Sequence, residues 1–306
     1  MPGILITGST GQVGGELVRL LRSQNPSLEV HAPIRSQLDL GEAASIRNTI
    51  RTLRPRWIIN PAAYTAVDRA EVDRDAAFRI NAEAPRIIGE EAAGIGAPVL
   101  HFSTDYVFAG DSSTPYEETD LTNPINIYGL SKLAGERNLA ATGAAHLIFR
   151  TSWVFGATNR NFLLTVLRVT RQQPVMRIVA DQYGAPTAAL DLAQMTATIV
   201  TQLERTAVED DLVEAVRPVQ GIYNAANSGE TTWHGFAEEA IRLRKLAEPT
   251  AGFGAVVPIS TAEYPTPARR PMSSRLNCVK LGRTFGIRMR PWQRALSEIL
   301  AEIPIP

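Results

Sequence analysis

Short apolar runs alternate with longer amphipathic stretches over the first hundred residues of the chain. The apolar runs predict buried strands, and the stretches between them carry apolar positions at the helical spacing. Strands are expected at 3–7, 28–33, 57–60 and 99–103, and helices at 12–23, 42–53 and 75–93. Strands that alternate with helices form a parallel sheet covered on both faces. The pattern therefore predicts an α/β fold built on a Rossmann-type doubly wound parallel sheet.

The alternation continues with a helix at 126–141 and a strand at 146–151, and it loosens beyond residue 156. Further helices are expected at 161–171, 191–206, 233–244 and 291–302. An apolar run at 221–226 ends in small polar residues and is expected to rejoin the main sheet. We therefore expect an NAD(P)-binding domain at 1–156, to which 176–206 and 219–235 return. A smaller, discontinuous α/β lobe at 157–306 would hold the substrate.

Composition narrows the classes of partner. The chain has 306 residues, of which 31 are basic and 31 acidic, so no net field favours binding to nucleic acid. The single cysteine, Cys278, excludes an internal disulfide framework. No apolar run reaches the ~20 residues that a membrane span needs, and no signal peptide is evident. The expectation is a cytoplasmic protein without nucleic-acid or membrane partners.

A glycine-rich turn follows the first predicted strand and precedes the first predicted helix, with glycines at positions 8, 11 and 14. This context is typical of dinucleotide-binding folds. Residues without side chains let backbone N–H groups and the helix N-terminus approach a pyrophosphate. Cofactor contacts are assigned here to Gly8, Thr10, Gly11, Gln12 and Val13.

The residues after the second strand bear on the choice of coenzyme. An acid at this place would bind the ribose 2′-hydroxyl of NAD, but the chain has Arg35, which can pair with the 2′-phosphate of NADP. NADPH is therefore favoured, and NADH stays open. Asn81 has two open interpretations, the floor of the nicotinamide site or a bond to local backbone. Further cofactor contacts are expected from Asp39, Leu40, Ala62, Ala63 and Tyr64.

Tyr128 and Lys132 lie four residues apart, on one face of a predicted helix. A nearby ammonium favours phenolate, so we expect Lys132 to lower the pKa of Tyr128 from its usual value near ~10. Thr104 ends the fourth strand and can share a carbonyl oxygen with Tyr128. This set predicts a reductase in which Tyr128 donates a proton to a ketone that receives a hydride.

Five runs, at 103–110, 128–136, 150–155, 181–187 and 264–271, resemble those of the dTDP-4-dehydrorhamnose reductase family, a group of extended short-chain dehydrogenases/reductases. The resemblance implies NAD(P)H-dependent reduction of the 4-keto group of dTDP-4-dehydro-β-L-rhamnose in deoxysugar biosynthesis. It implies that Tyr128 protonates O4, Lys132 holds the nicotinamide ribose and Thr104 adjusts the acidity of the reacting oxygen. Thr104, Asp105 and Trp153 would contact the sugar nucleotide, with Trp153 packed against the sugar.

Some positions depart from the family pattern or stay open. Pro61 stands where an alanine is common, and Leu190 stands where some relatives have an acid that holds magnesium between subunits. No metal is therefore predicted, and a homodimer is left as an open option. Three arginines, at 269, 270 and 275, are candidates for binding the substrate's diphosphate.

Two alternatives compete with the reductase. A sugar-nucleotide epimerase or dehydratase is one, but a dehydratase needs a further acid after Asp105, where Tyr106 stands. The other is a non-catalytic regulatory subunit, as known among relatives that serve methionine adenosyltransferase. The intact Tyr128, Lys132 and Thr104 favour catalysis over this second alternative.

Overall fold

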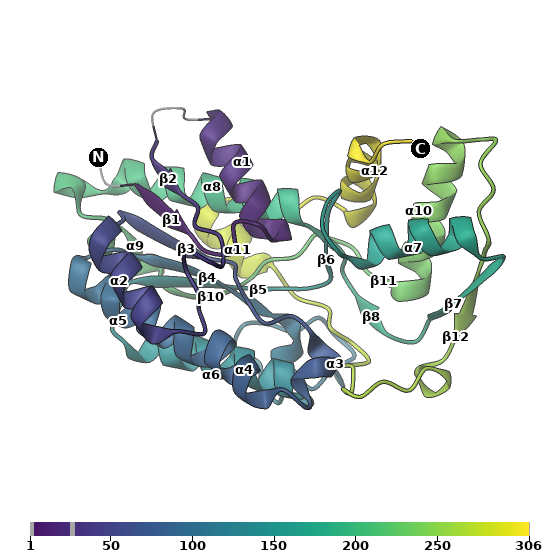
Figure 1. Ribbon diagram of the computed structural model, residues 1–306, viewed down its shortest axis with the longest axis horizontal. Helices are drawn as coiled ribbons and strands as arrows, with labels where there is room; N and C mark the ends of the chain where they lie inside the picture. Colours follow the sequence, from purple (N-terminus) through teal and green to yellow (C-terminus); the bar gives the residue numbers. More distant parts are fainter. Residues whose placement is uncertain (1–2, 25–27, 306) are drawn as a thin grey trace.

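The structure, a computed structural model, describes residues 3–24 and 28–305. Its larger lobe is built on one parallel sheet, and its smaller lobe contains the C-terminal helix (Figure 1). Within the described ranges, no helix is both long enough and apolar enough to span a bilayer.

The central sheet has six strands in the order β10-β5-β4-β3-β1-β2, and every neighbouring pair is parallel. All residues of β1, β3, β4 and β5 are buried, as expected for strands covered on both faces. The Rossmann-type fold expected from the sequence is confirmed. The strands are β1 (Ile4–Ile6), β2 (Val30–His31), β3 (Trp57–Asn60), β4 (Val99–Thr104), β5 (His146–Thr151) and β10 (Gly221–Asn224).

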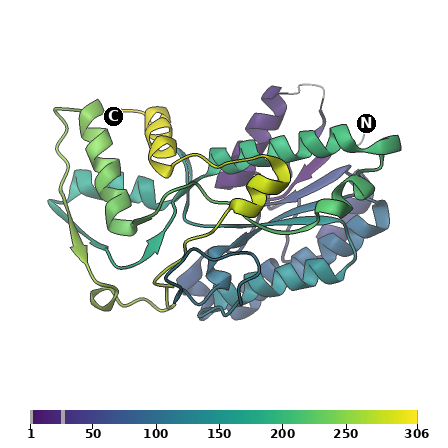
Figure 2. The same ribbon diagram turned by 180° about the vertical axis from the view of Figure 1, so that it is seen from behind.

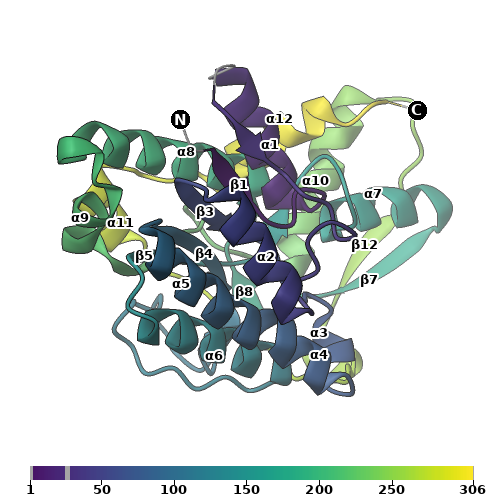
Figure 3. The ribbon, with the colours of Figure 1, turned by 60° about the vertical axis from the view of Figure 1, so that its left-hand side comes forward.

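Helices cover both faces of this sheet (Figure 3). Ile4 and Ile6 of β1 belong to the core beneath α1 and α8, whereas Leu5 belongs to the core beneath α2 and α5. This alternation is the two-residue period of a strand. The helices of this lobe are α1 (Gln12–Gln24), α2 (Ala43–Leu53), α3 (Val67–Ala70), α4 (Arg74–Phe78), α5 (Ala84–Ile95), α6 (Ile127–Ala141), α8 (Ala189–Thr206), α9 (Leu212–Val216) and α11 (Val279–Phe285).

The helix expected at 75–93 is divided into α4, a short π-helix at Arg79–Glu83, and α5. Pro85 has no N–H to donate to the carbonyl four residues before it, that of Asn81, so the α-helical ladder is interrupted here. The Asn81 side chain bonds both the N–H and the C=O of Tyr64, at 2.8 and 3.0 Å. Asn81 thus fixes the loop that follows β3.

The smaller lobe packs α7 (Phe162–Gln172), α10 (Trp233–Ala247) and α12 (Trp292–Glu302) around one apolar core. A parallel pair, β7 (Val175–Val179) and β12 (Ala255–Ile259), flanks them. Of the segments expected to return to the larger lobe, α8 packs on α1 and β10 pairs with β5, whereas β7 stays in the smaller lobe (Figure 2). Shorter elements are β6 (Val154–Phe155), β8 (Tyr183–Gly184), β9 (Thr187–Ala188), β11 (Thr231–Thr232) and 3₁₀ turns at Asp105–Val107, Val208–Asp210, Arg217–Val219 and Thr261–Glu263.

Candidate active site

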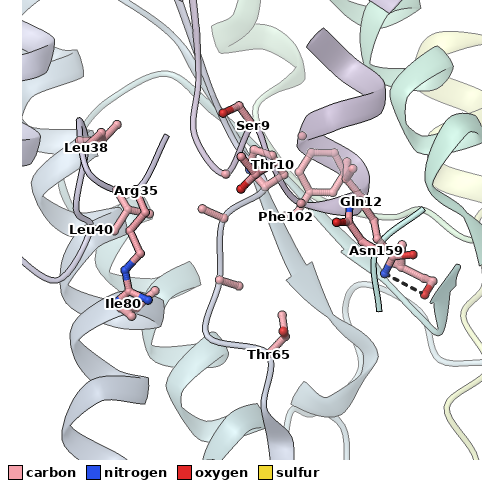
Figure 4. Close-up of a pocket in the computed structure, with 18 of the residues that line it drawn as sticks. Ser9, Thr10, Gln12, Arg35, Leu38, Leu40, Thr65, Ile80, Phe102 and Asn159 are labelled. Atoms are coloured by element: carbon pink, nitrogen blue, oxygen red, sulfur yellow. Dashed lines mark hydrogen bonds between the residues drawn. The ribbon is translucent and has the colours of Figure 1, made fainter. Parts of the chain in front are cut away.

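A cavity of about 470 Å³ opens at the carboxyl ends of β1, β3 and β4, above the glycine-rich turn. This edge of an open α/β sheet is where such folds bind ligands. In Figure 4, Arg35 and Leu40 lie on one side of the turn, and Gln12 and Phe102 lie on the other. The cavity therefore runs across the turn, from the loop after β2 to the end of β4.

The glycine-rich turn is tightly packed against the start of α1. A Cβ on Gly14 would lie 2.2 Å from the carbonyl oxygen of Gly8, and the N–H of Gly11 donates to that same oxygen at 2.8 Å. Only glycine fits at position 14 without moving the backbone. This packing presents the first N–H groups of α1 to the cavity, where an anionic group is stabilised.

Gly14→Ala should therefore abolish measurable NADPH binding and lower the free energy of unfolding by about 1–3 kcal/mol, because the new methyl group overlaps the turn. Coenzyme fluorescence titration and urea unfolding measure the two effects. Gly15→Ala is the matched control, since a Cβ there lies 3.5 Å from its nearest neighbour, the Ser9 carbonyl oxygen. Loss of binding in the Gly15 variant, or normal binding in the Gly14 variant, would remove the role assigned to this packing.

The cavity brings together nearly all the predicted cofactor contacts. Tyr64 is the exception, because its phenol donates to Asp73 at 3.0 Å and lies outside the lining. Sequence reasoning missed several lining residues, among them Ser9, Phe102 and Arg160. Ser9 is next in sequence to the predicted contact Thr10, whereas no sequence pattern near Arg160 indicates a cofactor contact. The predicted residues in the lining are Gly8, Thr10, Gly11, Gln12, Val13, Arg35, Asp39, Leu40, Ala62, Ala63, Tyr128 and Lys132.

Three residues that line this cavity have buried polar atoms without a hydrogen-bond partner in the described chain. They are Oε1 of Gln12, Oγ of Ser103 and Oγ1 of Thr151. An unpaired buried polar atom costs free energy that a polar ligand can recover. Together with the glycine cradle, these atoms fit a dinucleotide.

Lys132 is almost fully buried, with 1% of its surface exposed. Its Nζ donates to the carbonyl oxygen of Phe102 at 2.5 Å, and both residues belong to the lining of the cavity. Burial lowers the pKa of Lys132 to about 8, and the nearby Glu136 carboxylate opposes that fall. Lys132 is therefore mainly protonated at neutral pH.

A buried polar chain lies behind Lys132. Nζ is 3.4 Å from Nε2 of His101, Nδ1 of His101 is 3.0 Å from the Asn60 amide, and Thr7 Oγ1 donates to Asn60 at 2.5 Å. Burial, and next the charge of Lys132, hold the pKa of His101 well below its usual range, so the imidazole is neutral. The sequence assigned no specific role to this histidine. This series of polar contacts links Lys132 to Asn60 of β3 and to Thr7, which follows β1.

The pKa of Tyr128 differs from the expectation that Lys132 lowers it. Burial raises the pKa of the phenol above its usual value and the Asp105 charge raises it further, while a hydrogen bond with Thr104 opposes the rise. The structure does not support the predicted tuning, because the Lys132 ammonium is directed to the Phe102 carbonyl. The phenol is therefore protonated at neutral pH, as a proton donor must be.

Thr104 and Asp105 are buried at the end of β4 and lie outside the lining of the 470 Å³ cavity. Thr104 Oγ1 donates to Oδ1 of Asp105 at 2.8 Å and accepts from the N–H of Tyr106 at 3.1 Å. Oδ2 of Asp105 has no partner among the described residues. Burial raises the pKa of Asp105 to about 7.

A second cavity, of about 330 Å³, lies between the lobes and has Tyr106 in its wall. The Tyr106 ring meets edge to face that of Tyr128, which lines the first cavity, with centroids 5.9 Å apart. Of the three candidate arginines, Arg270 lines it and pairs with Asp68 at 2.8 Å. Arg275 instead pairs with Glu230 elsewhere, and position 269 lines neither cavity.

Trp153 follows β5 with a positive φ of 46°, a conformation that costs a non-glycine residue about 1–3 kcal/mol. Its indole stacks on that of Trp233, with ring centroids 3.7 Å apart and planes 11° apart. Trp153 lines neither cavity, whereas Trp233 lines the second.

No group of three metal-ligating side chains occurs within residues 3–24 and 28–305. Leu190 is buried, and the neighbouring Asp191 receives two hydrogen bonds from Arg290, at 2.9 and 2.7 Å. The carboxylate of Asp191 is thus neutralised by a guanidinium.

Comparisons with known proteins agree with this geometry. A family model described as RmlD substrate binding domain matches residues 1–305. The dTDP-4-dehydrorhamnose reductase of Burkholderia thailandensis is 41% identical over 295 residues, which cover 96% of each chain. A solved dTDP-4-dehydrorhamnose reductase from Clostridium acetobutylicum has a TM-score of 0.87 and 32% identity, covering 98% of this chain and 99% of that one.

A second solved dTDP-4-dehydrorhamnose reductase, from Bacillus anthracis in complex with NADP, has a TM-score of 0.85 and 31% identity over 98% of this chain and 99% of that one. Family model, curated relative and solved structures each span nearly the whole length. The resemblance inferred from the sequence motifs is confirmed, and the chain belongs to the RmlD family of dTDP-4-dehydrorhamnose reductases.

Proposed function

We propose that this protein reduces the 4-keto group of dTDP-4-dehydro-β-L-rhamnose with NADPH, giving dTDP-β-L-rhamnose for deoxysugar biosynthesis. One observation carries the proposal: Tyr128 and Lys132 line the same cavity as the glycine-rich turn. The B. thailandensis relative, 41% identical over nearly the whole chain, is named for this reaction.

The residues of the chain divide the work of the reaction. The coenzyme, when bound, supplies a hydride for the carbonyl carbon. Tyr128 holds a proton at neutral pH and gives it to the carbonyl oxygen, and Thr104 orients the phenol by a hydrogen bond. The Lys132 ammonium, which donates to the Phe102 carbonyl in the lining of the same cavity, would hold the nicotinamide ribose.

Arg35 is the proposed determinant of NADPH preference. It is exposed in the wall of the cavity, in the loop after β2, and the B. anthracis relative was solved with NADP. Arg35→Ala should raise the KM for NADPH about 10-fold or more, because it removes a charge-assisted hydrogen bond to the 2′-phosphate. Steady-state kinetics with both coenzymes measure this, and the KM for NADH should stay unchanged. An equal change for both coenzymes would show that Arg35 does not read the 2′-phosphate.

We propose Arg270 and Arg177 as the ligands of the substrate's diphosphate, since both line the second cavity next to Tyr106. Guanidinium groups bind phosphate oxygens in a planar, bidentate arrangement. Arg275 is set aside because it lines a different cavity. We further propose a cytoplasmic location for the protein. The homodimer stays an open option, as in the sequence analysis.

The dehydratase alternative lacks support from the site. Tyr106 occupies the place after Asp105 where a dehydratase needs an acid, and its pKa is raised above its usual value by burial. A regulatory subunit has no need of a protonated Tyr128 beside a buried lysine. A reductase uses both Tyr128 and Lys132, and it needs no acid at position 106.

A coupled assay tests the proposal, with the ketosugar nucleotide generated in place and NADPH oxidation followed by absorbance. We expect NADPH to be consumed in equal amount to the dTDP-rhamnose formed, and no consumption with UDP-glucose as the control substrate. Conversion of the ketosugar nucleotide to an isomer without NADPH oxidation would favour an epimerase. No turnover by folded, NADPH-binding protein would favour a regulatory subunit.

A further inference from the structure

Three buried polar side chains lie side by side on the central sheet, next to Lys132. Asn60 of β3 and His101 of β4 are register partners, and the N–H of Thr7 donates to the carbonyl oxygen of Ile59, which puts Thr7 beside Asn60. Each of the three residues is 1% exposed. Polar groups buried this deeply are stable in a fold when hydrogen bonds satisfy them. The direction of those hydrogen bonds therefore decides which atoms carry protons.

The hydrogen bonds in this row all run in one direction. The backbone N–H of Ala62 can only donate, and it lies 3.3 Å from Oγ1 of Thr7, so that oxygen accepts. The Thr7 hydroxyl gives its own proton to Oδ1 of Asn60 at 2.5 Å. The amide NH2 of Asn60 then faces Nδ1 of His101 at 3.0 Å. Because an NH2 group only donates, Nδ1 must carry a lone pair.

The row ends at Lys132. Burial and the charges of Lys132 and His146 hold the pKa of His101 well below its usual range, so the imidazole is neutral. Its single N–H must therefore be on Nε2, 3.4 Å from Nζ of Lys132. An ammonium has three donors and no acceptor, whereas a neutral amine has a lone pair that accepts from Nε2–H. Nζ approaches the carbonyl oxygen of Phe102, which accepts, to 2.5 Å. The longer distance to His101 is the one expected when two donors face each other.

We propose that His101 is a positioning residue that holds Nε2–H against Lys132, and that this donor makes the ammonium release its proton more readily. A hydrogen bond to the neutral form of a group disfavours its charged form. Burial acts in the same direction and lowers the pKa of Lys132 to about 8. The consequence for coenzyme binding rests on the proposed function, in which Lys132 holds the nicotinamide ribose. The position of the proton on His101 does not rest on it.

The other charged and titratable groups near Lys132 belong to α6 and β5. Glu136, four residues further along α6, raises the pKa of Lys132, and the Arg150 guanidinium of β5 pairs with this carboxylate. Tyr128, four residues earlier on α6, is protonated and uncharged at neutral pH. The variants used below leave all of these groups in place, so that a change in the behaviour of Lys132 reports on His101.

Histidine NMR tests the position of the proton without any turnover. The chain has four histidines, and the variant His101→Gln assigns the resonances of His101 by their loss. Two-bond proton–nitrogen correlations should show His101 with a bare Nδ1, a proton on Nε2 and no titration between about pH 6 and 9. His146 is the internal reference, because its Nδ1 lies 2.8 Å from the carbonyl oxygen of Ala144 and must carry a proton. A proton on Nδ1 of His101 would overturn the proposal, whatever the activity of the protein.

The pH dependence of NADPH binding tests the effect on Lys132. A cation that holds the coenzyme contributes below its pKa and is lost as the pH rises through it, so the NADPH Kd of the unchanged protein should begin to rise near pH 8. His101→Leu removes the donor and should move this onset upward by about one pH unit or more. In His101→Gln, Oε1 can accept from Asn60 while the NH2 group faces Lys132, so the onset should stay near that of the unchanged protein. His146→Leu is the matched control and should not move the onset.

The outcomes separate this inference from the proposed function. An unchanged or lower onset in His101→Leu would overturn the inference, and so would an equal upward shift in the leucine and glutamine variants. Should the leucine variant fail to fold, the histidine spectrum and the onset of the glutamine variant carry the test, and an upward shift of about one pH unit or more in that variant would overturn the inference. Absent NADPH binding by the unchanged protein would remove the proposed function, and the histidine spectrum would then decide the assignment of His101.

Discussion

Replacing Tyr128 with phenylalanine is expected to lower kcat about 100- to 10,000-fold, the usual contribution of a positioned acid. Among the residues that the structure describes, the phenol is the one acidic group that both lines the coenzyme cavity and is held protonated by burial. The ring itself stays, so its edge-to-face contact with Tyr106 is kept. Binding of NADPH should therefore be nearly unchanged. Single-turnover kinetics and coenzyme titration measure the two quantities.

Tyr223→Phe is the matched control for this variant. Tyr223 is also a buried tyrosine, in β10, and its hydroxyl donates to the carbonyl oxygen of Val219. Removing that hydroxyl should leave kcat unchanged. If Tyr128→Phe turned over as fast as the Tyr223 variant, the carbonyl oxygen would have to receive its proton from another group.

Replacing Arg150 with methionine is expected to lower the free energy of unfolding by about 3–5 kcal/mol, because it leaves a buried carboxylate without its partner. Arg150 of β5 and Glu136 of α6 are each 2% exposed, and two hydrogen bonds of 2.9 and 2.7 Å join them. Glu136 is also the charge that raises the pKa of Lys132. Urea unfolding measures the loss of stability.

A variant with methionine at both 150 and 136 separates the charge effect from packing. Removing both ions leaves no buried carboxylate without its guanidinium, so the double variant should be more stable than Arg150→Met alone. Equal stability of the two variants would show that the lost contacts of Arg150, including its position over the Phe108 ring, account for the effect.

The parts of the fold that the sequence predicted are those with local periodicity. Strands such as Trp57–Asn60 and His146–Thr151 are continuous apolar runs because both sheet faces are covered. The pair of β7 and β12 was not predicted, since Val175 and Val257 are exposed and the two strands lie far apart in sequence. The π-helix at Arg79–Glu83 also escaped prediction, although Pro85 marks the interruption.

The site was predictable where chemistry follows directly from a strand end or a helix face. Arg35 and Lys132 are examples. Arg35 follows a strand and Lys132 lies on a helix face, and both line the cavity as these places predict. The electrostatics were not predictable, because the effect of burial on Tyr128 and the contact of Lys132 with the Phe102 carbonyl depend on packing. The stack of Trp153 on Trp233 joins residues distant in sequence and leaves no local signal.

The central claim is that one cavity brings a hydride from NADPH and a proton from Tyr128 to the two ends of one carbonyl group. Turnover of the ketosugar nucleotide with NADPH deuterated stereospecifically at C4, in each of its two forms, tests this most directly. We predict that one form places deuterium on C4 of the sugar in every product molecule and that the other places none. A product without deuterium at C4 from either form would contradict the account.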